Sequence, residues 1–205
     1  MRKNNIIKKE IKILSQRMLN LFYFFLGCAS FVLFVIYDLN QVSLGLQWIR
    51  PFFAVGCMLL AVSTAVLTFV DQPIFVLSTA FRAIFGILAL LSLGLTIYSL
   101  FFALPFKETY IEEDVSNRVY DRGIYALCRH PGVLFFISFY FFHWLYTGKK
   151  LMFMAFVVYG LLNSFYAWLQ DRFFFERLFC NYDTYRKTTP FLIPTRASVK
   201  RSLKG

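Results

Sequence analysis

Charged residues are scarce in this sequence: Asp, Glu, Lys and Arg together make up 16% of its 205 residues. Paired cysteines are missing as well. The four cysteines stand apart, and no Cys-x-x-Cys pair occurs among Cys28, Cys57, Cys128 and Cys180. Isolated cysteines of this kind indicate neither a zinc site nor a disulfide framework. The sequence therefore predicts no metal site.

The chain shows no cleavable signal peptide, because its first apolar run is long enough to span a membrane and lacks a small-residue cleavage site. No internal repeat is visible, and the apolar runs carry almost no charge. Transporters and channels often combine inverted repeats with charges inside the membrane. A small transporter or channel is therefore the weaker interpretation.

Apolar and aromatic residues are present in large excess. Hydrophobic residues make up 59% of the sequence and aromatic residues 20%, with 27 phenylalanines and 12 tyrosines. A soluble domain of this length could not bury so many, whereas a lipid bilayer accepts them. The sequence therefore predicts an all-α integral membrane protein of one domain, built as a helical bundle.

The net charge is +11, from 22 Lys and Arg against 11 Asp and Glu. The basic residues gather at the two ends of the chain and in its polar loops, which suits the anionic head groups of membrane lipids. No basic helix stands outside the apolar runs, so no nucleic-acid partner is predicted. Nothing in the sequence indicates an oligomeric state.

The basic residues also bear on orientation. Residues 105–131 and the C-terminal face carry more Lys and Arg than the opposite side, so we expect them in the cytoplasm. Five spans would nevertheless place two basic termini on opposite sides, and a shallow, non-spanning helix among the first three would remove this conflict. The compactness of the chain suggests a bacterial cell membrane.

About five apolar runs are long enough, or nearly so, to cross a bilayer. They cover residues 18–37, 51–70, 132–146 and 151–169, and one more lies within 74–104. We therefore expect three spans over 18–104, then a polar loop, a helical hairpin and an interfacial C-terminal helix. Before them, residues 1–17 combine basic and apolar side chains, as an interfacial helix or a solvated arm does. A basic tail covers 195–205, and we expect it to be disordered.

A basic, proline-containing stretch at residues 123–131 joins the polar loop to the fourth apolar run. Pro131 is favoured at a first helical position, and the free N–H groups that follow carry the positive end of the helix dipole. Arg129 adds a fixed charge with a bidentate fork, so this helix start is a candidate clamp for an anion. The alternative is that Arg129 only meets lipid phosphates while Pro131 starts a helix. The same order recurs before the second run at Arg50-Pro51, so the pattern is partly generic.

A tight turn at residues 148–150 links the last two apolar runs into a helical hairpin. Two antiparallel helices joined by a short turn return to the side on which they began. The hairpin therefore predicts that Asp171 lies beside Arg129 and His130, although about forty residues separate them in the chain. A carboxylate near lipid needs such a partner.

The pattern Gly-x-Tyr-x-x-x-Arg-His-Pro, followed by an apolar hairpin and then Tyr-x-x-Tyr and Pro-x-x-Ile-Pro, resembles the isoprenylcysteine carboxyl methyltransferase and phospholipid methyltransferase superfamily. Those are integral membrane enzymes that use S-adenosylmethionine. The resemblance covers about residues 115–194, within a methyltransferase-like region of residues 105–194. The residues that carry it are Gly123, Tyr125, Arg129, His130, Pro131, Tyr182, Tyr185, Pro190, Ile193 and Pro194.

Several positions depart from the family pattern. Val133 and Phe135 stand where members usually carry Tyr and Gly. Gln170-Asp171 stands where members tend to carry a Glu-Glu pair. Enzymes that methylate prenylated cysteine place an arginine one turn before that pair, and Ala167 stands there, so a farnesyl-cysteine carboxylate is a disfavoured acceptor. The departures also support an alternative, a catalytically degenerate member with a structural or partner-binding role in the membrane.

The resemblance implies methyl transfer from S-adenosylmethionine to a lipid-like or otherwise hydrophobic acceptor, which arrives from the bilayer between the two hairpin helices. Arg129, His130 and Asp171 form the implied catalytic set. The helix start with Arg129 would hold the donor's carboxylate, and Asp171 would accept from its ribose or amine. Tyrosine faces would meet its adenine or its cation. The implied cofactor-binding residues are Asn117, Tyr125, His130, Pro131, Asp171, Tyr182 and Tyr185.

On this interpretation Asp171 and the helix start enclose a hollow of donor size, roofed by Tyr182 and Tyr185. Each residue also has a simpler role. His130 could cap the helix, and Asp171 could end the fifth run in a salt bridge with Arg129. The tyrosines could anchor the chain at the membrane interface.

Overall fold

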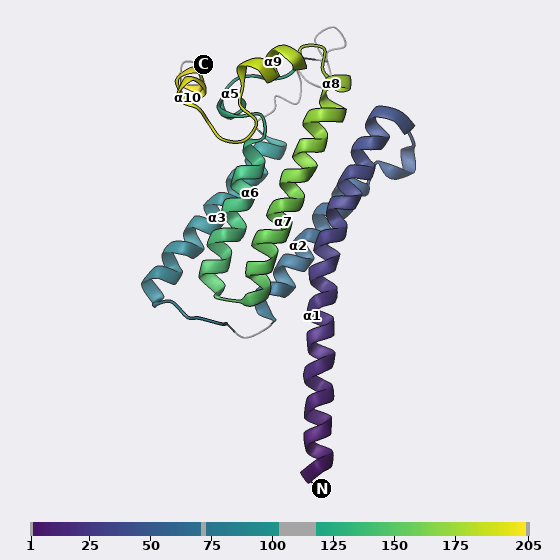
Figure 1. Cartoon of the computed structure of the whole chain (residues 1–205), viewed down its shortest axis with the longest axis vertical. Coiled ribbons are helices and arrows are strands. Elements are labelled where there is room, and N and C mark those ends of the chain that lie inside the picture. Colours follow the sequence, from purple (N-terminus) through teal and green to yellow (C-terminus); the bar gives the residue numbers. More distant parts are fainter. Residues whose placement is uncertain (1, 71–72, 103–117, 204–205) are drawn as a thin grey trace.

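The computed structural model describes residues 2–70, 73–102 and 118–203. Over these ranges the chain is helical, without a β-strand, and Figure 1 shows the long helices side by side in one bundle. Four helices in the described part are long and apolar enough to span a membrane. They are Ile6–Leu44, Gln47–Phe69, Thr79–Phe101 and Lys150–Leu178. The predicted all-α membrane bundle is therefore confirmed.

The first helix, α1 (Arg2–Leu39), is one unbroken helix of 38 residues. Residues 1–17, which we expected as a segment of their own, are continuous with the first span from residue 2 onward. No Gly or Pro precedes Gly27 to interrupt the helix. At 1.5 Å per residue the helix is about 57 Å long, well beyond the ~30 Å hydrocarbon core. In Figure 1 its N-terminal half extends past the ends of the other helices.

A short turn reverses the chain into α2 (Phe52–Phe69). The turn consists of a π-helical segment, η1 (Asn40–Leu44), and a 3₁₀ segment, η2 (Gln47–Ile49). The buried side chain of Asn40 holds it together, because its amide donates to the Leu46 carbonyl and accepts from the Leu46 N–H. The second predicted span is thus confirmed to within a residue at each end.

The third helix, α3 (Thr79–Phe101), follows a non-helical stretch over residues 73–78. The first part of the third apolar run, which we expected in the interface up to Arg82, is therefore helical only from Thr79. The Arg82 guanidinium lies over the ring of Tyr146, 5.4 Å from its centroid. This contact joins the start of α3 to the end of the helix that returns beside it.

The predicted hairpin follows the single turn α5. The bounds are α5 (Ile124–Leu127), α6 (Pro131–Thr147) and α7 (Lys150–Leu169). Gly148 in the turn has φ +66°, and a Cβ there would collide with the Phe75 carbonyl oxygen, so the turn requires glycine. Lys149 ties the turn to the end of α2 by donating to two backbone carbonyls. With 17 residues, α6 is shorter than the four helices named above, so the fourth of the five expected runs is not among the helices long enough to span a membrane.

Neighbouring helices pack in the order α3, α6, α7, α1, α2. Because successive helices run in opposite directions, the N-terminus and the last helices lie at opposite ends of the bundle (Figure 1). Its core is aromatic: Tyr140 and Tyr159 are fully buried and meet edge to face. Their hydroxyls bond the hydroxyls of Thr64 and Ser63 on α2, which satisfies them where no water is present.

Beyond α7 the chain continues through a π-helical segment into three short helices. The bounds are η3 (Gln170–Phe174), α8 (Phe175–Leu178), α9 (Tyr182–Thr188) and α10 (Arg196–Ser202). Residues 175–203, referred to below as the cap, cover the end of the bundle at which α6 begins (Figure 1). The basic tail over 195–205, which we expected to be disordered, instead contains α10, because a capping box of Thr195 and Ser198 begins a helix there.

Candidate functional site

The hairpin returns Asp171 to the loop before α6, as predicted. Asp171 Oδ1 lies 2.8 Å from Arg129 Nε and 3.5 Å from His130 Nε2. Asp171 Oδ2 accepts from Arg129 Nη2 at 3.1 Å. All three side chains are at most 12% exposed. A buried cation, a carboxylate and an imidazole thus meet at the end of the bundle that the cap covers.

Tyr182 of α9 completes this group from the cap. Its hydroxyl donates to Asp171 Oδ1, and the residue is 2% exposed. Burial and the adjacent carboxylate raise the pKa of Tyr182 above its usual value, so the hydroxyl stays protonated and able to donate. Arg129, His130, Asp171 and Tyr182 are referred to below as the polar cluster.

Arg129 also links the loop before α6 to the cap. Its Nη1 donates to the carbonyls of Arg186 at 2.8 Å and Thr189 at 3.1 Å. Its backbone N–H donates to the Pro190 carbonyl at 2.9 Å. The guanidinium carbon lies 5.7 Å from the centroid of the Phe191 ring. A fixed positive charge therefore sits at the N-terminal end of α6, where it adds to the helix dipole.

His130 lies directly before Pro131, the first residue of α6. Its ring stacks on Phe175, with 5.7 Å between centroids, and meets the edge of Phe191 at 5.1 Å. The side chain makes no capping bond to α6, so the alternative of a capping histidine is wrong. Burial lowers the pKa of His130 more than the neighbouring Asp171 carboxylate raises it, and the imidazole is therefore neutral at pH 7.

Two buried nitrogens of the polar cluster make no hydrogen bond with a described residue. They are Arg129 Nε, which is within ion-pair distance of Asp171 but outside hydrogen-bond geometry, and His130 Nε2. Arg129 Nε keeps the Asp171 carboxylate as its ionic partner, whereas His130 Nε2 has no hydrogen bond, and leaving a buried polar atom in that state costs on the order of 1–3 kcal/mol. Such groups require an explanation, and a ligand that bonds them is one.

Tyr185 and Tyr125 lie beside the polar cluster. The Tyr185 hydroxyl donates to the Tyr125 carbonyl at 2.8 Å, and the Tyr125 hydroxyl donates to the Ser99 carbonyl of α3 at 2.6 Å. Burial raises the pKa of Tyr185. Both phenols therefore fasten the loop before α6 to its neighbours. Asn117, the remaining predicted cofactor-binding residue, lies outside the described residues.

The hollow that we expected between Asp171 and the start of α6 is closed in this structure. Arg129 and Tyr182 both contact the Asp171 carboxylate, and Asp171 is 9% exposed. A salt bridge with Arg129 at the end of the fifth run, the simpler role of Asp171, is present as well. The predicted residues therefore meet, and a ligand among them would have to displace some of these contacts.

The sequence interpretation missed Asp38, near the end of α1. It is 9% exposed, and its Oδ2 accepts from Gln170 Nε2 at 2.9 Å. The same nitrogen donates to the Tyr166 hydroxyl at 2.9 Å. Gln170 and Asp171 thus face different neighbours, α1 and the start of α6, from consecutive positions of η3. The only signal of Asp38 in the sequence is an acidic residue at the end of an apolar run, which equally marks a helix end.

Helix α10 also reaches the site. Arg201 Nη2 donates to the Ala126 carbonyl at 3.3 Å and to Thr189 Oγ1 at 2.8 Å. The Ser202 hydroxyl donates to the Gly123 carbonyl at 2.7 Å. These bonds join the last helix to the loop that carries Arg129 and His130. Basic residues near a chain end suit lipid head groups equally well, so the sequence gives no sign of this role.

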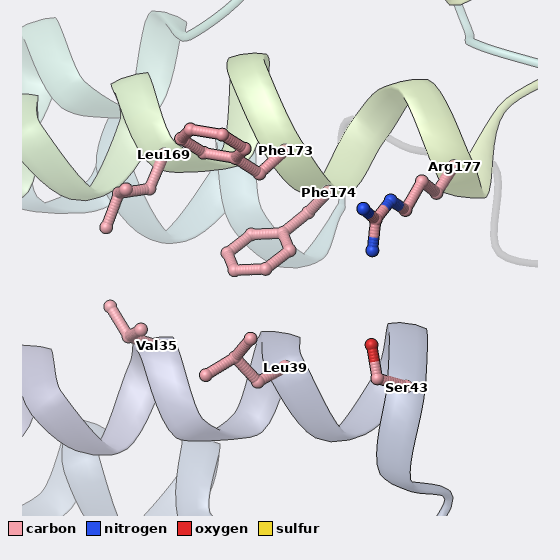
Figure 2. Close-up of a pocket in the computed structure, with 7 residues that line it drawn as sticks. All are labelled: Val35, Leu39, Ser43, Leu169, Phe173, Phe174 and Arg177. Carbon is pink, nitrogen blue, oxygen red and sulfur yellow. The ribbon is translucent and has the colours of Figure 1, made fainter.

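A cavity of about 330 Å³ opens where α7 meets α1 (Figure 2). Its lining residues are Val35, Leu39, Ser43, Leu169, Phe173, Phe174 and Arg177. It is referred to below as the α1–α7 groove. Between α6 and α7, where we expected the acceptor path, Phe139 and Tyr166 are packed in the core, each 8% exposed.

Comparisons of the chain with protein-family models, with curated proteins and with solved structures found no match. A functional conclusion therefore depends on the polar cluster and on the residues that carry the family resemblance.

Proposed function

We propose that this chain is a membrane-embedded methyltransferase that uses S-adenosylmethionine and acts on a lipid-like or hydrophobic acceptor. One observation carries the proposal: Asp171 lies 2.8 Å from Arg129 and 3.5 Å from His130 at the start of α6. Arg129 and Asp171 are 42 positions apart in the chain. They stand at the two ends of the hairpin between the motifs that resemble the superfamily, so their meeting in space supports one shared site.

The polar cluster offers the groups that a donor with a carboxylate, an amine and a ribose needs. Arg129 and the first N–H groups of α6 suit the carboxylate, and Asp171 suits the amine or the ribose diol. His130 Nε2, which makes no hydrogen bond with a described residue, suits a further polar atom of the donor. When bound, the donor would supply an electrophilic methyl group.

Methyl transfer by in-line displacement depends on alignment and on a water-poor site more than on a strong acid or base. The polar cluster suits this requirement, because its side chains are buried and held from both α6 and the cap. The neutral His130 can orient a ligand without adding a second positive charge beside Arg129. Tyr182 belongs to the cap, so a movement of α9 that withdraws its hydroxyl from Asp171 would open the cluster.

A second candidate is a degenerate family member in which the polar cluster only fastens the cap. The closed geometry favours it: Asp171 pairs with Arg129 and accepts from Tyr182. Arg129 donates to three backbone carbonyls besides. Val133 and Phe135, which differ from the usual family residues, support it as well.

Isothermal titration of the purified protein with S-adenosylmethionine, and with its demethylated product, separates the two candidates. The methyltransferase proposal expects saturable binding of both ligands below millimolar concentration. Adenosine and methionine, titrated singly as controls, are expected to bind more weakly because each offers only part of the contacts. If neither full ligand binds at millimolar concentration, the enzymatic proposal is wrong and the cap-fastening role stands.

We infer further that the cap faces the cytoplasm of a bacterial cell, because the loops and helices at that end of the bundle carry most of the basic residues outside α1. Cys180 is exposed in the cap, whereas Cys128 is buried. A membrane-impermeant maleimide is expected to label Cys180 in inside-out vesicles and not in intact cells. The variant Cys180→Ser should remove the signal. Labelling of Cys180 in intact cells would mean that the cap faces the outside of the cell.

A further inference from the structure

The α1–α7 groove has a polar end and an apolar end. Apolar side chains from both helices line most of it, and Ser43 and Arg177 stand at one end (Figure 2). Its volume of about 330 Å³ is at the small end of the range of ligand pockets. That is room for part of an amphiphile, such as a stretch of hydrocarbon chain, and too little for a whole lipid.

The two walls change from apolar to polar in the same direction. One wall comes from Val35 and Leu39 of α1 and from Ser43 of η1, which continues α1. The other wall includes Leu169 of α7, Phe173 of η3 and Arg177 of α8, which continue one another along the chain. Both helices run toward the end of the bundle that the cap covers (Figure 1). The polar end of the groove therefore lies at the membrane boundary and its apolar end lies deeper, which is how a lipid is oriented.

The cation at the polar end is not neutralised by the described residues. No hydrogen bond or ion pair joins Arg177 to any of them, and no lining residue is acidic. The adjacent Glu176 pairs with Arg186 of α9 instead. In Figure 2 the Arg177 guanidinium extends over the groove opposite Ser43. A guanidinium at the membrane boundary suits a phosphate, to which it donates in a planar fork.

We propose that the α1–α7 groove binds an anionic membrane phospholipid, with part of one acyl chain against the apolar walls and the phosphate group on Arg177 and Ser43. The charge of Arg177 and the direction of the polarity gradient identify this occupant. The lipid is a bound component of the membrane-embedded protein rather than the methyl acceptor. The inference therefore does not rest on the proposed methyl transfer.

Photocrosslinking of the full-length protein in lipid nanodiscs tests this site. Two sets of nanodiscs carry the same diazirine-bearing acyl chain, on phosphatidylglycerol in one and on phosphatidylcholine in the other. We expect crosslinked peptides from the end of α1 and from η3, and more of them with phosphatidylglycerol. Arg177→Gln is expected to lower the phosphatidylglycerol signal about fivefold, the effect of one boundary cation on an anionic lipid. Arg172→Gln, exposed on η3 but outside the lining, should stay within twofold of the wild type.

A second variant tests the apolar wall. Leu39 is 43% exposed, so Leu39→Trp can fill the groove without disturbing the core, and it is expected to lower the crosslinking of both lipids. Equal crosslinking of the two lipids, or an unchanged signal in Arg177→Gln, would overturn the proposal. So would crosslinks confined to other helices, or a second copy of the chain found in the groove. Methyl transfer measured in parallel bears only on the other proposal.

Discussion

Replacing Asp171 with alanine is expected to lower the free energy that holds the cap closed by about 3–5 kcal/mol. The substitution leaves the Arg129 guanidinium buried without its counter-charge, and the Tyr182 hydroxyl loses its acceptor. Breaking a buried pair by removing one partner is costly for this reason, even where the intact pair contributes little. Hydrogen exchange at the Arg129 amide, which donates across to the Pro190 carbonyl of the cap, reports this free energy.

An exposed ion pair in the same region provides the control. Glu176 and Arg186 pair across α8 and α9 with side chains that are 36% and 34% exposed. Solvent screens such a pair, so Glu176→Ala is expected to change the same free energy by only about 0–1 kcal/mol. If the two variants opened the cap equally, Asp171 would not be the residue that fastens it, and the cluster would be weaker than its burial implies.

The sequence allowed the hairpin to be predicted because single residues determine its ends. Pro131 has no N–H to leave unpaired at a first helical position, and Gly148 alone tolerates the backbone of the turn. Once these two residues place the ends of α6 and the start of α7, Asp171 has little freedom about where it returns. The contact between Asp171 and Arg129 could therefore be predicted without coordinates.

The contacts that close the site could not be predicted in the same way. The cap brings Tyr185 and Arg201 to the loop before α6 and Tyr182 to Asp171. The position of the cap depends on contacts between residues 60 to 75 positions apart. A Tyr-x-x-Tyr motif predicts which residues lie near the site, but the rotamer that brings a phenol onto Asp171 is a result of packing. For this reason the hollow that we predicted between Asp171 and the start of α6 is closed by side chains in the structure.

Gln170 stands where the superfamily that the sequence resembles tends to carry glutamate, and another part of the chain bears on this difference. Its amide nitrogen donates to Asp38 on α1, and an amide is a donor where a carboxylate is not. A glutamate at this position would face the Asp38 carboxylate in a buried place and would need a proton to stay there. Glutamine at position 170 is therefore consistent with the Asp38 carboxylate on α1. The two residues are 132 positions apart, so no local sequence pattern reveals their hydrogen bond.

If the chain is the methyltransferase proposed above, replacing His130 with alanine is expected to lower methyl transfer by about 100-fold or more, because the loss of one positioning group from an aligned site has effects of this size. Transfer from labelled S-adenosylmethionine to membrane lipid measures it. If His130 contacts the donor, the Michaelis constant for the donor should rise, and His130→Gln, which keeps a polar group in the same place, should recover part of the loss. The Phe175 and Phe191 rings that pack against His130 could also shift, so hydrogen exchange in the cap is measured alongside.

The chain contains one other histidine, which makes the matched control. His143 lies within α6, far along the helix from His130, and its ring bonds Thr68 of α2. His143→Gln keeps a partner for that hydroxyl and is expected to leave transfer within a few-fold of the wild type. If His130→Ala and His143→Gln lost methyl transfer equally, the effect of His130→Ala would come from a disturbed fold and not from a lost contact with the donor. Full activity in His130→Ala would move the reaction away from the polar cluster. If the wild-type protein shows no methyl transfer and Asp171→Ala still opens the cap, the second candidate function holds. The polar cluster then serves only to fasten the cap.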